Sequence, residues 1–246
     1  MVELDGAWLR SHDNAAGMEA KVGVVHAGGE RIGRTRTRLR ERRYAATLSG
    51  SAAFGPLVTA AVERRNGYEA PEQTLLGDGA AWIWRVGQRA AAEATPVLDR
   101  WHLAKARREA VRRAVADEAA RAEWTQRIEA RLGAGDVPGT LTVLADLSAQ
   151  HPEPAVAAFA EFVAAQAPRI PDYAARRAAG LPIGSGGIEK GVDVVVNRRC
   201  KGKRGTRWRR ARADGVLALR VAELNGEWRQ RLAAALHSDA ATLPAF

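Results

Sequence analysis

The sequence changes character twice along its length, and this change limits the folds that the chain can adopt. Residues 1–104 alternate short apolar segments with turn residues, and residues 105–180 are dominated by Ala, Arg and Glu at helical spacing. Residues 181–246 return to a glycine-rich loop, followed by basic and helical segments. Strand-like segments interrupted by an all-helical block predict an α/β fold whose core is formed by the two outer parts, with a helical insertion between them.

Local patterns predict the individual elements. Apolar or alternating segments bounded by turn residues predict strands, of which the one at 34–48 is expected to be exposed and the one at 73–84 to lead into a turn. The predicted strands are 2–9, 20–28, 34–48, 73–84 and, within TPVLDRWHL, a short strand from 95 that ends at Asp99. Apolar spacing near the helical repeat predicts helices, including one long helix or two over 102–133. The other predicted helices are 54–67, 139–149, 153–167 and 207–236.

The composition favours a polyanionic partner. The 246 residues carry 38 Lys and Arg against 28 Asp and Glu, a formal net charge of +10. Nucleic acid is therefore expected ahead of an acidic membrane surface. The longest apolar stretch, AVAAFAEFVAAQA, contains Glu161 and is too short and too polar to span a bilayer. The single cysteine, Cys200, excludes an internal disulfide and a cysteine-based zinc site, which fits a reducing intracellular setting.

Three acidic residues stand in unusual contexts. Asp5 lies inside VELDGAWL, Asp78 lies between two glycines in LLGDGAAWIW, and Glu189 follows the glycine-rich LPIGSGG. Acids are depleted in strands, and carboxylates that meet at strand ends suit Mg²⁺, which prefers oxygen ligands. Each acid also has an ordinary interpretation, because Asp-Gly is a common turn and Glu189 suits the first turn of a helix. The metal interpretation depends on the three acids together.

Asp99 and His102 form an Asp-x-x-His pair in LDRWH. The spacing fits a proton relay or a positioning pair near a metal. It also fits Asp99 as the N-cap of a helix that begins near Arg100, with His102 on the exposed first turn, and spacing alone favours this second interpretation. The other four histidines lack ligand spacing and are predicted to be structural or solvated; they are at positions 12, 26, 151 and 237.

A basic segment lies near the end of the chain. Residues 198–212 contain nine Lys or Arg and no acid, which favours salt-dependent phosphate contacts over a solvated basic surface. Trp208 has two interpretations, stacking on a base or filling the core. The predicted DNA-binding residues are Arg198, Arg199, Lys201, Lys203, Arg204, Arg207, Trp208, Arg209 and Arg210. The tryptophans predicted to lie in the core are Trp82, Trp84, Trp101, Trp124 and Trp228.

Four segments carry a family resemblance. VELDGAWL, GDGAAWIW, LDRWH and PIGSGGIEKGVDVVVNRRCKGKRGTRW occur in this order, and with them the sequence resembles the catalytic regions of bacterial insertion-sequence transposases of the DDE type. It is similar to the Kra-type and Lre-type groups and, more widely, to the Mutator-like superfamily. The resemblance covers most of the chain and is thinnest over 105–180. It implies an RNase H-like fold, a mixed five-stranded sheet with helices on both faces and a helical insertion.

The resemblance also implies roles for the site residues. Asp5, Asp78 and Glu189 become the metal-binding acids, with Mg²⁺, or Mn²⁺ in its place, as cofactor, and Asp99 and His102 match an Asp-x-x-His near the active site. The implied reaction is cleavage of transposon ends by water, followed by attack of the freed 3′-hydroxyl on target DNA. The implied partner is double-stranded DNA, bound by a homo-oligomer on the nucleoid of the bacterial cytoplasm.

Two features differ from the transposases that the sequence resembles. Those proteins carry an N-terminal DNA-binding region, whereas here the first catalytic strand begins almost at Met1, which indicates a fragment, a decayed remnant or a late start. The run Val194–Val196 follows Glu189 where the family has a helix, and β-branched residues lower helix propensity. The alternatives to an active transposase are a truncated protein that binds DNA without cutting it, and an RNase H-like nuclease acting on RNA–DNA hybrids or junctions.

Overall fold

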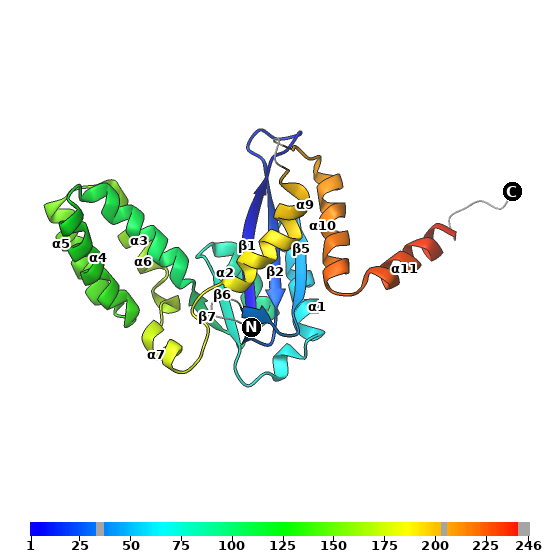
Figure 1. The fold of residues 1–246 in the computed structure, drawn as a ribbon, viewed down its shortest axis with the longest axis horizontal. Coiled ribbons are helices and arrows are strands. Elements are labelled where there is room, and N and C mark those ends of the chain that lie inside the picture. The colour runs from blue at the N-terminus through cyan, green and yellow to red at the C-terminus, as the bar shows by residue number, and fades with distance from the viewer. Residues whose placement is uncertain (33–36, 203–205, 241–246) are drawn as a thin grey trace. The chain divides into compact units, whose positions relative to one another are not determined.

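The computed structural model describes residues 1–32, 37–202 and 206–240, and the chain forms two compact units (Figure 1). The first, which we call the sheet unit, comprises Met1–Leu75, Trp82–Ala94 and Gly186–Phe246. The second, which we call the helical unit, comprises Leu76–Ala81 and Thr95–Ser185. The fold is mixed α/β, and its five-stranded mixed sheet with many helices is consistent with the RNase H-like fold expected from the sequence.

The main sheet has the strand order β5-β2-β1-β6-β7, and β3 pairs with β4 in a separate two-stranded sheet. Strand β1 is therefore central, and it pairs antiparallel with β2, which pairs antiparallel with β5. The strands are β1 (Val2–Leu9), β2 (Met18–Val25), β3 (Gly29–Arg31), β4 (Thr37–Leu39), β5 (Arg43–Thr47), β6 (Thr74–Gly77) and β7 (Thr95–Leu98).

The sheet unit packs helices on both faces of its strands. On one face, Val22 and Val24 of β2 belong to a buried cluster with Ile188 of α8 and Leu217 of α10. On the other face, a side chain at Gly23 would meet Leu4 of β1 and Phe54 and Val58 of α1. This division follows from the alternation of side chains along a strand.

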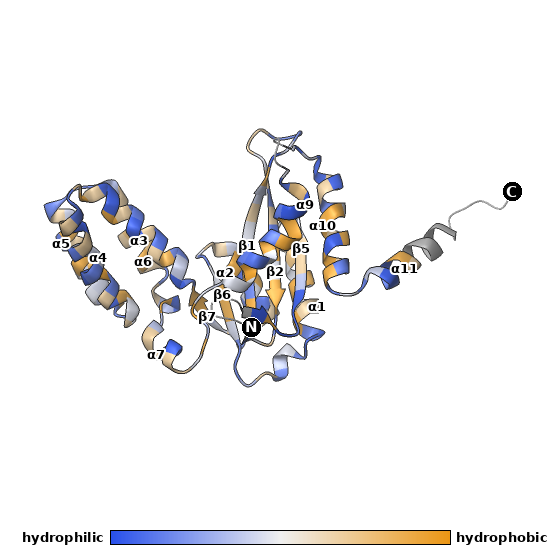
Figure 2. Ribbon diagram, viewed as in Figure 1, coloured by the Kyte–Doolittle hydropathy of each residue, from blue (hydrophilic) through white to orange (hydrophobic). Residues whose placement is uncertain are grey.

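The helices of the sheet unit come from three separate parts of the chain. They are α1 (Gly50–Glu63), η1 (Gly67–Glu69), α2 (Ala81–Ala90), α8 (Gly186–Val192), the π-helical η3 (Asp193–Asn197), α9 (Arg198–Cys200), α10 (Arg210–Leu224) and α11 (Trp228–Ala240). Figure 1 shows α8 passing over β1 and β2, and Figure 2 shows β2 as hydrophobic along most of its length, while α10 alternates hydrophilic and hydrophobic residues. Burial of this apolar surface is the main term that stabilises the unit.

The helical unit consists mainly of α3 (Arg100–Ala114), α4 (Glu118–Gly133), α5 (Val137–Gln150), α6 (Pro154–Ala165), η2 (Ala167–Arg169) and α7 (Tyr173–Ala178). Aspartates start four of these helices, because each accepts a hydrogen bond from a backbone N–H of the first turn. These N-caps are Asp99, Asp117, Asp136 and Asp172. The 102–133 stretch is thus two helices rather than one, and the second begins at the Asp117 cap.

Three predicted elements differ from the structure. The segment at 34–48 is not one exposed strand, because its described part forms β4 and then β5, and β5 is mostly buried. The strand predicted at 73–84 ends at Gly77, and Trp82–Trp84 belong to helix α2. The tail helix predicted at 207–236 is two helices, since Gly226, with φ of +74°, separates α10 from α11.

No helix among the residues that the structure describes combines the length and the apolar character needed to cross a membrane. This agrees with the sequence-based exclusion of the stretch around Glu161 as a membrane span.

Candidate active site

Asp5 lies in the middle of the central strand β1, opposite Val22 of β2. Its carboxylate is half-buried, and Oδ1 accepts a hydrogen bond from the N–H of Gly6 at 2.7 Å. Because side chains alternate along a strand, Asp5 shares a face with Glu3 and Ala7, which lie under α8 and its buried cluster. The strand therefore presents Asp5 on the side of the sheet that α8 covers.

Glu3 is a second acid on this face, and only 1% of it is exposed. Its Oε1 lies 2.8 Å from Nε2 of His26, and its Oε2 accepts the N–H of Ile188 at 2.7 Å. The N–H of Gly28 donates to His26 Nδ1 at 3.1 Å, so a proton on Nε2 satisfies both ring nitrogens. A side chain at Gly187 would meet Glu3 Oε1 at 2.6 Å. The pair thus holds the first turn of α8 against β1.

Glu189 lies in that first turn of α8. Its side chain is exposed, whereas the neighbouring Ile188 is buried. The helix continues directly into the π-helical η3, in which Val195 and Val196 are buried against the sheet. The β-branched run is therefore helical, because burial of its valines outweighs their low helix propensity.

Asp78 directly follows strand β6 and belongs to the helical unit. Its Oδ1 accepts the N–H of Ala80 at 2.9 Å, which is the turn interpretation of the Asp-Gly sequence. Gly79 has φ of +108°, and a side chain there would meet Phe162 at 2.8 Å. Gln166 Nε2 also donates to the Gly79 carbonyl at 3.1 Å. This tightly held turn fixes a half-buried carboxylate at the end of the strand.

Asp99 is the hub of a buried polar network in the helical unit. Its Oδ1 accepts the N–H groups of Trp101 at 2.6 Å and His102 at 3.0 Å, and its Oδ2 accepts the N–H of Ser185 at 2.7 Å and the Ser185 hydroxyl. Burial raises the pKa of Asp99, but hydrogen bonds from His102 and Ser185 outweigh it and lower that pKa to about 2. Asp99 is therefore the N-cap of α3, as spacing alone favoured.

His102 is half-buried on the first turn of α3, and its Nδ1 lies 3.6 Å from Asp99 Oδ2. Its ring makes an edge contact with Trp101, with centroids 5.0 Å apart. Tyr173 donates its hydroxyl to the Leu98 carbonyl at 2.8 Å, and burial raises the pKa of this phenol. The Asp-x-x-His pair thus stands in a fixed, mostly buried setting.

The structure brings some of the predicted site residues into one unit and separates others. Asp5 and Glu189 belong to the sheet unit, and Asp78, Asp99 and His102 belong to the helical unit. Among residues 1–32, 37–202 and 206–240, no group of three or more His, Cys, Asp and Glu side chains is arranged to hold a metal ion. The three predicted acids offer only oxygen donors, which is the ligand chemistry that Mg²⁺ requires.

The basic segment is anchored to the sheet unit through its tryptophan. The indole N–H of Trp208 donates to the Cys200 carbonyl at 2.8 Å, and its half-buried side chain packs against the buried cluster, while its predicted contact with DNA stays a prediction. Cys200 is itself buried, which raises the pKa of its thiol. Arg198 pairs with Asp193 at 3.0 Å, and Arg210 donates to the Leu48 carbonyl.

The other predicted DNA-binding residues of this segment fall into two groups, those that the structure describes and those outside the described residues. The side chains of Arg199, Lys201, Arg207 and Arg209 are exposed. Lys203 and Arg204 lie outside the described residues. These exposed cations are suited to phosphate contacts, and Arg198 and Arg210 are exposed as well.

Two of the tryptophans predicted to lie in the core are instead half-exposed. Trp84 and Trp124 are buried and Trp82 is half-buried, but 50% of Trp101 and 42% of Trp228 is exposed. Trp101 is at the first turn of α3 and Trp228 begins α11, so both lie near helix ends, where packing is incomplete.

Sequence patterns missed the Glu3–His26 pair. A signal was present, since Glu3 stands between Val2 and Leu4 inside a strand and His26 directly follows another apolar strand. A buried acid and a buried histidine require partners.

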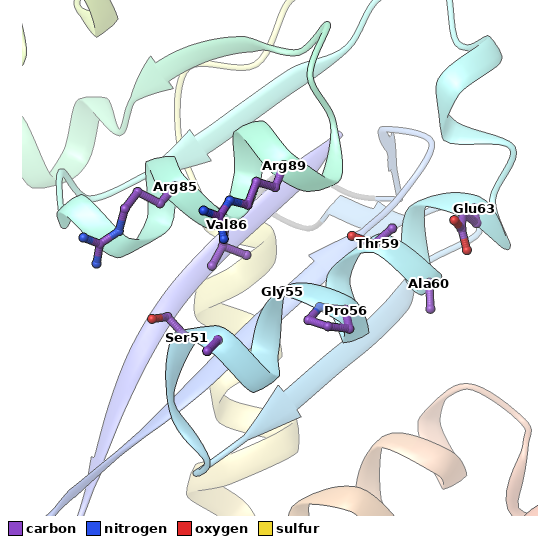
Figure 3. A pocket seen from close by; sticks show the side chains of 10 residues that line it. Ser51, Gly55, Pro56, Thr59, Ala60, Glu63, Arg85, Val86 and Arg89 are labelled. Carbon is purple, nitrogen blue, oxygen red and sulfur yellow. The ribbon is translucent and has the colours of Figure 1, made fainter.

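A large pocket of the sheet unit lies between α1 and α2 and has a volume of about 730 Å³ (Figure 3). Arg85 and Arg89 reach it from α2, while Ser51, Thr59 and Glu63 reach it from α1. None of the predicted site residues lines it.

The chain matches a protein-family model over most of its length. The model of a family described as Uncharacterised protein family (UPF0236) matches residues 1–233. The chain belongs to this family. No curated protein matches the chain. In this UPF0236 member, the matched range includes Asp5, Asp78, Asp99, His102 and Glu189, and it also includes the whole basic segment.

Proposed function

We propose that the chain is the catalytic domain of a DDE-type insertion-sequence transposase that cleaves DNA and transfers strands in a metal-dependent reaction. The observation that carries the proposal is the placement of Asp5 on the central strand of a β5-β2-β1-β6-β7 sheet, under a helix that carries Glu189. The four sequence segments that resemble DDE transposases support it. Its DNA substrate would place the protein on the nucleoid in the bacterial cytoplasm.

The proposal gives each acid a role. Asp5, Asp78 and Glu189 are the ligands of the metal, and their carboxylates are all at least partly exposed. Bound Mg²⁺ supplies an activated water and neutralises negative charge at the reacting phosphate. The chain itself holds the acids in place, through β1 for Asp5, the Gly79 turn for Asp78, and the Glu3–His26 pair for the helix of Glu189.

The basic residues bind the substrate in this proposal. Arg199, Lys201, Arg207 and Arg209 are exposed and would contact phosphates of duplex DNA, at transposon ends and at the target. Their contribution does not depend on base sequence, and it weakens as salt rises. Asp99 and His102 act as positioning residues, because Asp99 is almost completely buried.

The test is nicking of supercoiled plasmid in Mg²⁺ by the purified chain and by Asp78→Asn. We expect the variant to lose at least about 100-fold in nicking rate, because a metal ligand is removed, while gel-shift affinity for DNA changes little. Asp146→Asn, on the exposed surface of α5, is the matched control and should nick as the wild type does. Unchanged nicking by Asp78→Asn would rule out the assignment.

A second candidate function is DNA binding without cleavage. It is favoured by the lack of a three-ligand group among the described residues. Salt-dependent binding with no nicking in either Mg²⁺ or Mn²⁺ would support this function and exclude the first. Cleavage of an RNA–DNA hybrid in preference to duplex DNA would instead identify an RNase H-like nuclease.

A further inference from the structure

Trp8 is the most exposed large hydrophobic side chain among the described residues, with 60% of it accessible. It stands near the end of β1, next to the loop that connects β1 to β2. A single exposed apolar residue is common on protein surfaces and indicates nothing by itself. What distinguishes Trp8 is the set of groups around it.

Trp8 lines a hollow of about 340 Å³ together with Arg10, Gly17 and Arg207. Gly17 has φ of +82°, and a side chain there would meet the Leu9 carbonyl at 2.7 Å and the Trp8 ring at 3.6 Å. The indole therefore lies beside a backbone position without a side chain. A hollow of this volume lies within the range of pockets that hold small organic ligands, so it has room for a nucleobase.

Two arginines reach this hollow from distant parts of the chain. Trp208 donates its backbone N–H to the Arg10 carbonyl at 3.0 Å, and His12 donates its N–H to the Trp208 carbonyl at 3.0 Å. These bonds, with the bridge between Ser11 and Trp208, fix residue 207 beside the β1–β2 loop. The basic segment is thereby joined to the edge of the Trp8 hollow.

Neither guanidinium is engaged within the described part of the chain. Arg10 and Arg207 are exposed, and no hydrogen bond or ion pair links their side chains to another described residue. Asp13, in the same loop, uses its backbone N–H to bond the Ser11 hydroxyl at 3.0 Å and does not line the hollow. The site therefore combines a flat aromatic surface with two available cations.

We propose that Trp8, Arg10 and Arg207 bind an unpaired nucleotide of DNA, with the base stacked on the indole and the arginines on the flanking phosphates. Base–aromatic stacking beside a cationic track is the general way in which proteins hold single strands. Inside duplex DNA the base faces are covered by their neighbours, so away from the duplex ends the indole can stack only on an unpaired base. The inference rests on the proposed function insofar as the ligand is DNA.

The position of Trp8 separates this site from the candidate metal acids. Asp5 and Trp8 are three residues apart on β1, so their side chains point to opposite faces, about 10 Å apart along the strand. The bound nucleotide is therefore not the one whose phosphate is cut. A change at Trp8 should weaken binding of a single strand without altering the metal chemistry of DNA that is already bound.

The experiment measures fluorescence anisotropy of a fluorescein-labelled oligothymidine and of a duplex of the same length. We expect Trp8→Ala to bind the single strand about tenfold more weakly, and Trp8→Phe to stay within about threefold of the wild type, because a phenyl ring still stacks. The duplex affinity should change less than about threefold. Tyr68→Ala, which removes another exposed aromatic of the sheet unit, is the matched control and should bind as the wild type does.

A double variant tests the arginines. Arg10→Ala with Arg207→Ala should lower the slope of log Kd against log salt by about 1.4 for the single strand, since each phosphate contact contributes about 0.7. Arg85→Ala with Arg89→Ala removes the same charge from α2 and should change the slope much less.

Several results would overturn the inference. These are single-strand binding by Trp8→Ala at wild-type strength, equal losses for single strand and duplex, or a Trp8→Phe variant as weak as Trp8→Ala. Circular dichroism melting shows whether each variant is folded. Failure of the proposed catalytic function gives a different pattern, in which plasmid nicking is absent but Trp8→Ala still loses affinity for the single strand.

Discussion

The two least exposed carboxylates among the described residues lie one in each unit, and they are satisfied differently. Glu3 of the sheet unit contacts an imidazole, His26, and one backbone N–H, that of Ile188. Asp99 of the helical unit accepts three backbone N–H groups and the hydroxyl of Ser185. Both are 1% exposed, and both hold the beginning of a helix.

The comparison separates structural acids from candidate metal ligands. In both of these buried carboxylates each oxygen already contacts a donor group of the protein, which leaves little capacity for a cation. Asp5 and Asp78 are half-buried and Glu189 is exposed, so each is less enclosed than Glu3 or Asp99. An acid in a strand-like sequence is thus not enough to indicate a metal ligand, and exposure is the feature that distinguishes the two classes.

The largest effect is expected at Glu3. Glu3→Ala leaves His26 and the N–H of Ile188 buried without their acceptor, which should lower the free energy of unfolding by about 3–5 kcal/mol. Urea denaturation measures this. Glu30→Ala, an exposed acid on β3, is the control and should stay within about 0.5 kcal/mol of the wild type. An equally small loss at Glu3 would show that the pair does not hold α8.

A smaller effect is expected at Asp99. Asp99→Asn keeps one acceptor oxygen but replaces the other with an amide N–H₂, which faces the N–H and hydroxyl donors of Ser185. The substitution should lower the free energy of unfolding by about 2–3 kcal/mol at pH 7. Urea denaturation at pH 7 measures this loss, and a variant as stable as the wild type would contradict the network described here.

The pH dependence of stability is a further test of how Asp99 is held in the helical unit. The pKa of Asp99 in the folded state is about 2, below its ordinary value of 3.8, so its stabilisation is present above pH 4. This contribution, about 2 kcal/mol, is lost as pH falls from 4 through 2. The wild type should therefore lose stability over this range more steeply than Asp99→Asn, as measured by thermal melting. Parallel curves for the two proteins would contradict the lowered pKa.

The smallest effect is expected at Ser185. Ser185→Ala removes the hydroxyl donor but keeps the backbone N–H that bonds Asp99 at 2.7 Å, so the loss should be about 1 kcal/mol. Thermal melting at pH 7 measures it, with Ser51→Ala in α1 as a partly exposed control. A loss of stability as large as that of Asp99→Asn would mean that the Ser185 hydroxyl supplies most of the stabilisation in the Asp99 network.

Prediction from sequence succeeded where the signal was local. Strand β1 has the predicted bounds of 2–9, and helix α1, the helical block and the turn at Asp78 all have short-range causes such as apolar spacing and Asx bonding. It failed where contacts with residues distant in the sequence determined the local structure. The sequence of Trp82–Trp84 predicts a strand, but the segment is helical in α2, where Trp82 contacts Phe54 and Lys21.

The residues of the candidate site also divide into those that the local sequence identified and those whose surroundings depend on the tertiary structure. Sequence identified the acids and the basic segment because residue type and context are visible in one dimension. It left open whether Trp208 stacks on a base or packs in the core, and the structure shows its indole bonded to Cys200 and packed against the core. It overlooked Trp8, because the exposure of a strand residue depends on which helices cover the sheet.

By itself, the sequence determined the alternation of strands and helices and the N-capping aspartates, because each depends on residues only a few positions apart, and it determined the net charge, which depends on composition alone. Only the tertiary structure decided that Glu3 would bond Ile188, 185 positions away, and that Arg10 and Arg207 would flank Trp8. Such contacts require the chain to close long loops, and the packing that compensates for this entropy is a property of the whole fold.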